Sequence, residues 1–144
     1  MTTYLLDVNV LIALIDPAHV QHDAAHAWFA ATGHHAWATC PLTENGVLRI
    51  VGHPRYPNSP GNPSAVAPLM AGLRALPGHV FWPDDISLHD PQHVNATLLQ
   101  SSGQLTDSYL LALACANGGQ LATFDARLVT KAVQHGAAGL CVLK

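Results

Sequence analysis

Short apolar runs alternate along this chain with longer segments whose apolar residues recur at helical spacing. Strands that are apolar throughout must be covered on both faces, so this alternation is typical of a parallel β-sheet between helices. We therefore expect an α/β fold, a central parallel sheet flanked by helices in an α/β/α sandwich, as a single domain over residues 1–144. The expected strands are 3–7, 36–40, 79–83, 120–124 and 139–143, and the expected helices are 9–15, 19–32, 41–51, 63–76, 91–99, 107–116 and 126–135.

The composition is that of a compact globular protein. Hydrophobic residues make up 49% of the chain and charged residues only 10%, which excludes a disordered chain. No apolar run reaches the roughly 18–20 residues of a membrane-spanning helix, and the first residues do not resemble a signal peptide. The cysteines are far apart and odd in number, which favours free thiols in a reducing compartment. We expect a cytoplasmic protein with no membrane contact.

The first strand ends in a carboxylate that lies inside an apolar run, YLLDVNVLIALI (residues 4–15). A buried charge is costly unless it has a partner, so Asp7 requires one from elsewhere in the chain. Three further acids also lie at the ends of apolar elements. They are Glu44 in the first turns of a helix, Asp107 at the start of an apolar helix, and Asp125 directly after a strand.

These acids could converge, because strand ends and the helices that follow them face one edge of a parallel sheet. Converging carboxylates repel one another, and a divalent cation removes the conflict. Ligands that are all oxygen suit Mg²⁺ or Mn²⁺, and such ions support hydrolysis of phosphodiesters. Three of these acids, taken alone, have a simpler explanation: Asp107 could stabilise a helix dipole, Asp125 could be an ordinary turn residue, and Glu44 could be a surface glutamate. Asp7 is harder to explain in this way.

Four stretches of the chain resemble the PIN-domain ribonucleases, and within them the VapC-type toxins of type II toxin–antitoxin systems. The stretches are LLDVNVLIAL (5–14), TENGVLRI (43–50), TDSYLLALA (106–114) and LATFDARL (121–128). They occur in the order of the family and span almost the whole chain.

This resemblance implies a PIN fold and an endoribonuclease toxin that hydrolyses RNA with one or two Mg²⁺ or Mn²⁺ ions. It further implies inhibition by a cognate VapB-like antitoxin and a homodimer. By the resemblance, the catalytic and metal-binding residues are Asp7, Glu44, Asp107 and Asp125. Asn9 would fix the first carboxylate or a bound water, and Thr123 and Thr106 are candidate hydrogen-bond donors to the site.

Charge argues against an RNA substrate, because the formal net charge is −3 and nucleic-acid-binding proteins are usually basic. Bound metal ions would offset part of this deficit. Arg49, Arg127 and Lys131 are candidate phosphate contacts, and the last two are four residues apart on an expected helix. The same side chains could equally be solvated surface bases.

Other features leave alternatives open. Tyr56 could stack on an RNA base or anchor the proline-rich loop 52–65. His22 and His26 have a spacing that could bind zinc, but no third ligand is in view. The main alternative function is a non-catalytic PIN-fold module that binds RNA or a partner protein. A phosphatase with Asp7 as the nucleophile is disfavoured, because the second acid of an Asp-x-Asp pair is Asn9 here.

Overall fold

A sheet of parallel strands forms the centre of the computed structural model, which describes residues 1–144. The sheet has five strands in the order β3-β2-β1-β4-β5, and every neighbouring pair is parallel. This confirms the expected parallel sheet. The strands are β1 (Tyr4–Leu6), β2 (Trp37–Thr39), β3 (His79–Phe81), β4 (Gln120–Thr123) and β5 (Leu140–Val142).

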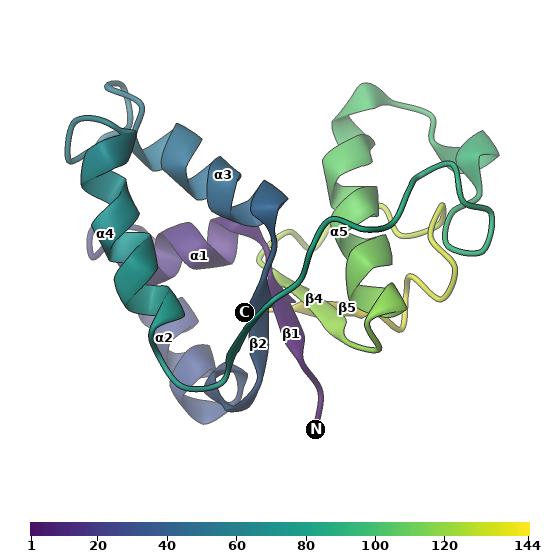
Figure 1. Ribbon diagram of the computed structural model, residues 1–144, viewed down its shortest axis with the longest axis horizontal. Coiled ribbons are helices and arrows are strands. Elements are labelled where there is room, and N and C mark those ends of the chain that lie inside the picture. Colours follow the sequence, from purple (N-terminus) through teal and green to yellow (C-terminus); the bar gives the residue numbers. More distant parts are fainter.

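Helices cover both faces of the sheet unequally. Figure 1 shows most of the helices gathered on one side of the strands, whereas the last helix lies on the other side together with irregular chain. The first group is α1 (Val8–Ile15), α2 (His22–Ala31), α3 (Pro41–Val51) and α4 (Pro63–Arg74), and the single helix is α5 (Leu105–Ala116). None of these helices has the length and apolar character needed to cross a membrane.

The core is divided by the sheet into two clusters, and β1 contributes to both. Successive side chains of a strand point to opposite faces. Leu6 accordingly packs with α1 to α4 on one face, and Leu5 packs with α5 on the other. Both residues are fully buried. The residue that follows them, Asp7, therefore leaves the sheet between two packed layers.

Two helix predictions, at 91–99 and 126–135, are wrong. Both segments are mostly turns, with only a short 3₁₀ turn at Ala96–Leu98. They pair with each other instead: Val94 and Val133 form an antiparallel bridge, and Asn95 N donates to Ala132 O at 2.8 Å. This long-range pairing uses backbone groups that a helix would have bonded locally.

Helix α1 is capped at both ends by side chains. Asp7 is its N-cap, and the carboxylate accepts a hydrogen bond from Val8 N at 2.7 Å. At the other end, the ring of His22 donates to Ala13 O at 2.7 Å and that of His26 donates to Leu14 O at 2.8 Å. The two histidines thus satisfy carbonyl groups that the end of a helix leaves without partners.

Candidate active site

The site begins where two neighbouring strands end. β1 and β4 are parallel, with Leu6 opposite Ala122, so Asp7 and Asp125 follow the same edge of the sheet. The strand order reverses between these two strands, because β2 and β3 lie on one side of β1 and β4 and β5 on the other. In open parallel sheets, ligands bind at such a switch point.

Thr123, the last residue of β4, connects three polar groups at this edge. Its hydroxyl donates to Asp7 Oδ2 at 2.8 Å and accepts from Asn9 Nδ2 at 3.1 Å and from the Asp125 backbone N–H at 3.1 Å. Asn9 Oδ1 in turn accepts from Phe124 N at 3.3 Å. The first turn of α1 is therefore fastened to the end of β4 through side chains.

A cleft of about 390 Å³ opens above these residues. Asp107, in the first turn of α5, lines the cleft together with Asp7 and Asp125, so three of the four predicted acids share it. No Lys or Arg side chain is present in its lining. The remaining lining residues are Val8, Asn9, Ile12, His19, Ile50 and Tyr56.

The cleft disfavours negative charge on two of its acids. Burial raises the pKa of Asp7, which is only 7% exposed, and the charge of Asp125 raises it further; hydrogen bonds from Thr123 and Val8 oppose both effects. The pKa of Asp107 is also raised, first by burial and then by the charges of Asp7 and Asp125. The carboxylates therefore repel one another, and a cation would relieve the repulsion. No three acid, imidazole or thiol groups already surround one point closely enough to hold an ion.

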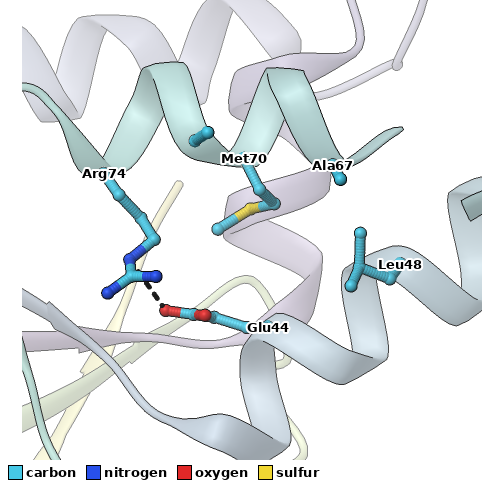
Figure 2. Close-up of a pocket in the computed structure, with 6 residues that line it drawn as sticks. Glu44, Leu48, Ala67, Met70 and Arg74 are labelled. Atoms are coloured by element: carbon cyan, nitrogen blue, oxygen red, sulfur yellow. Dashed lines mark ion pairs between the residues drawn. The ribbon is translucent and has the colours of Figure 1, made fainter. Parts of the chain in front are cut away.

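Glu44 does not line this cleft. It faces a neighbouring pocket between α3 and α4, where Arg74 Nε lies 3.2 Å from Glu44 Oε2 (Figure 2). The same oxygen accepts a hydrogen bond from Thr39 Oγ1 at 2.6 Å. Leu48 and Met70 contribute the apolar wall of this pocket. The proposed role of Glu44 as a metal ligand thus stays a prediction, and Arg74 would have to release the carboxylate.

The other candidates lie outside the cleft. Thr106 is exposed in the first turn of α5 and does not line the cleft. Arg49 and Arg127 are exposed, and Lys131 Nζ lies 3.4 Å from Gln100 Oε1. Because no helix forms at 126–135, the prediction that Arg127 and Lys131 share a helix face is wrong.

Two residues of the cleft lining carry polar chemistry that the sequence motifs did not assign to a site, His19 and Tyr56. Both depend on Asp16, the C-cap of α1, which is 6% exposed. Burial would raise the pKa of Asp16, but hydrogen bonds from Tyr56, Asn58 and Ala18 N outweigh this effect and lower it. Tyr56 therefore anchors the loop that follows α3. This is one of the two roles expected for it, the other being to stack on an RNA base. In the sequence, the feature that marks this anchor is an acid, Asp16, between an apolar run and Pro17.

Comparison with known proteins identifies the fold and its family. The PIN domain family model matches residues 4–133, and the chain belongs to this family. Within it, the chain belongs with the VapC proteins. It is 42% identical over 129 residues to Ribonuclease VapC44 of Mycobacterium tuberculosis, covering 90% of each chain. It is 44% identical over 132 residues to Ribonuclease VapC38 of the same organism, covering 91% of each.

A solved structure shows the same fold. The crystal structure of Mycobacterium tuberculosis VapC20, a toxin that cleaves the sarcin–ricin loop, matches the chain with a TM-score of 0.64 and 16% identity over 96% of each chain. This similarity confirms the expected α/β architecture.

Proposed function

We propose that the chain is an endoribonuclease toxin of the VapC type that hydrolyses RNA phosphodiester bonds with Mg²⁺ or Mn²⁺. The observation that carries the proposal is the cleft at the β1–β4 switch point, lined by Asp7, Asp107 and Asp125. Sequence similarity also supports the proposal, because the chain is 37–44% identical to several VapC ribonucleases over most of its length. The place of action would be the cytoplasm.

The residues of the cleft fit a hard divalent cation. Asp7, Asp107 and Asp125 offer carboxylate oxygens, which Mg²⁺ and Mn²⁺ prefer, and no Lys or Arg side chain lines the cleft to take the place of an ion. Mg²⁺ needs only one or two protein carboxylates, because waters and substrate phosphate complete its shell. When bound, one or two such ions would neutralise charge on the phosphoryl oxygens and make a water more acidic.

The protein's own contribution is to fix the acids before RNA arrives. Asp7 is held by Val8 N and Thr123, so its carboxylate cannot rotate away from the cleft. Asn9 holds the Thr123 hydroxyl in turn, and this orients the proton of the hydroxyl toward Asp7. Asp125 lines the cleft and is exposed, so its carboxylate stays accessible to a ligand from solvent.

Asp107→Asn tests the proposal. Purified wild-type chain should cut total bacterial RNA at discrete positions with Mg²⁺ or Mn²⁺, and EDTA should stop the reaction. The substitution keeps the size of the side chain but removes its charge, so cleavage should fall by more than about 100-fold while the thermal transition stays cooperative. A folded variant that cuts RNA at the wild-type rate would refute the assignment. A folded, metal-loaded wild type that cuts no RNA would favour the binding module instead.

The partners of this proposed toxin would be RNA, a cognate VapB-like antitoxin and a second copy of the chain, as in the VapC proteins. Sedimentation of the purified chain, alone and with a purified VapB-like antitoxin, would measure both associations.

A further inference from the structure

Hydrogen-bond donors are scarce in the acidic cleft. Asn9 Nδ2 already donates to Thr123 Oγ1 at 3.1 Å, and the Tyr56 hydroxyl already donates to Asp16. The carboxylates can only accept, and no Lys or Arg lines the cleft. Apart from the second N–H group of Asn9 Nδ2, His19 is therefore the one lining side chain that can still offer a donor to a ligand.

The free donor of His19 is a particular nitrogen. The backbone N–H of Gln21 donates to His19 Nδ1 at 3.0 Å, so in the neutral ring Nδ1 is the acceptor and Nε2 carries the proton. Nε2 has no hydrogen-bond partner in the protein. A phosphate oxygen accepts a hydrogen bond from such a group.

Tyr56 offers a different surface to the same cleft. Because Asp16 occupies its hydroxyl, what Tyr56 presents to a ligand is the aromatic ring. Ile50, which is 39% exposed, adds an apolar side chain to the lining. A flat ring next to an aliphatic group is a surface on which an unpaired base stacks.

Asp16 fixes His19 and Tyr56 relative to each other. Its carboxylate accepts from Tyr56, and its backbone carbonyl accepts from His19 N at 3.0 Å. The pKa of this carboxyl is lowered despite burial, so it stays ionised at neutral pH and keeps the bond from Tyr56. The bond from His19 N goes to the backbone carbonyl and does not depend on this charge. The phosphate donor and the ring are thus held in place before a ligand binds, which reduces the entropy lost on binding.

We propose that His19 and Tyr56 form a subsite for one nucleotide of single-stranded RNA next to the three acids. His19 Nε2 binds a phosphate oxygen, and the Tyr56 ring stacks on the base of that nucleotide. The proposal rests on the proposed ribonuclease function and names positioning residues rather than catalytic ones. It requires an unpaired base, because a base within a duplex does not expose its face.

The test measures RNA binding by variants of the full chain that also carry Asp107→Asn, so that the probe is not cut. The probe is a short fluorescein-labelled single-stranded RNA of random sequence, in Mg²⁺, with Kd read by anisotropy. His19→Asn keeps an acceptor near the Nδ1 position but removes the Nε2 donor, and it should raise Kd about tenfold. His19→Gln places an amide donor near Nε2 and should restore binding. Tyr56→Leu removes the ring and should raise Kd about tenfold. Tyr56→Phe keeps the ring and should not raise Kd in this way.

His53 is the matched control. Arg55 N donates to His53 Nδ1 at 3.0 Å, the same local bond that His19 makes, but His53 does not line the cleft. His53→Asn should leave Kd unchanged. If His19→Asn and Tyr56→Leu bind the probe as tightly as His53→Asn, the subsite does not exist. Cleavage of total RNA by the wild-type chain reports separately on the ribonuclease, so failure of one proposal is distinguishable from failure of the other.

Discussion

In the folded chain without a bound cation, burial and the neighbouring acids disfavour the negative charge of Asp107. Replacing it with Asn removes repulsion with Asp7 and Asp125, so in EDTA at neutral pH the variant should melt about 2–4 °C above the wild type. Its raised pKa means that the folded state holds the proton more tightly than the unfolded one. The stabilisation by that proton is full below the ordinary carboxyl pKa of 3.8 and is lost as pH rises through the raised value.

The pH dependence of this difference provides the control. The melting temperatures of wild type and Asp107→Asn should converge as pH falls below 3.8, where the Asp107 carboxyl is protonated in both the folded and the unfolded state. Mn²⁺ should raise the melting temperature of the wild type more than that of the variant, because only the wild type keeps all three carboxylates. Equal melting temperatures in EDTA at neutral pH would contradict the repulsion inferred here. Differential scanning fluorimetry measures all of these quantities.

At the residue scale, sequence patterns found three acids of the cleft and Asn9, but not His19. Asp7 was conspicuous because apolar residues surround it, and Asp125 because it directly follows a strand. His19 and Tyr56 lie in turns, and their positions follow from hydrogen bonds to Asp16 that no periodicity encodes. The orientation of Glu44 toward Arg74 could not be predicted either, because it depends on how α4 packs on α3.

Among the helices, the close approach of α1 and α3 depends on Gly46. A Cβ atom there would lie 2.7 Å from Val8 Cγ2, so Gly46→Ala must displace Val8, the residue next to Asp7. We expect a loss of about 1–3 kcal/mol in the free energy of unfolding and a lower rate of RNA cleavage. Urea titration and the total-RNA assay measure these two effects.

Gly72 is the matched control for this substitution. It lies within α4 and is exposed, and a Cβ atom there would meet nothing within 4 Å. Gly72→Ala should therefore stabilise the chain by roughly 0.5–1 kcal/mol, because alanine loses less backbone entropy in a helix. If both alanine variants are equally stable, close packing at Gly46 does not limit the approach of the helices.

Strands and most helices could be predicted because their signals are local. Each strand is a short apolar run, and α3 was predicted at 41–51 as observed because Pro41 marks its first turn and its apolar period ends at Val51. The two wrong helices have one common cause. Segments 91–99 and 126–135 are far apart in sequence and satisfy each other's backbone groups, which a single segment's periodicity does not reveal.

Across the whole molecule, acidic groups outnumber basic ones, nine to six, and none of the basic side chains lines the cleft. RNA binding should therefore depend on Mg²⁺ more than on release of monovalent ions. For Asp107→Asn in fixed Mg²⁺, we expect log Kobs against log[KCl] to have a slope no steeper than about −1.5, that is, about two phosphate contacts. Anisotropy titrations at several KCl concentrations give this slope, and a much steeper one would indicate a basic surface outside the cleft.

The pairing of β1 with β4 also determines when the protein can become active during its synthesis. Asp7 is made almost at once, but its hydrogen-bond donor, Thr123, lies 116 residues later in the chain. A ribosome that has reached β3 has made only three of the five strands, and Asp125 does not yet exist. An unfinished chain therefore lacks the assembled cleft, and a cell that makes this toxin is not exposed to its nuclease until β4 has emerged and paired.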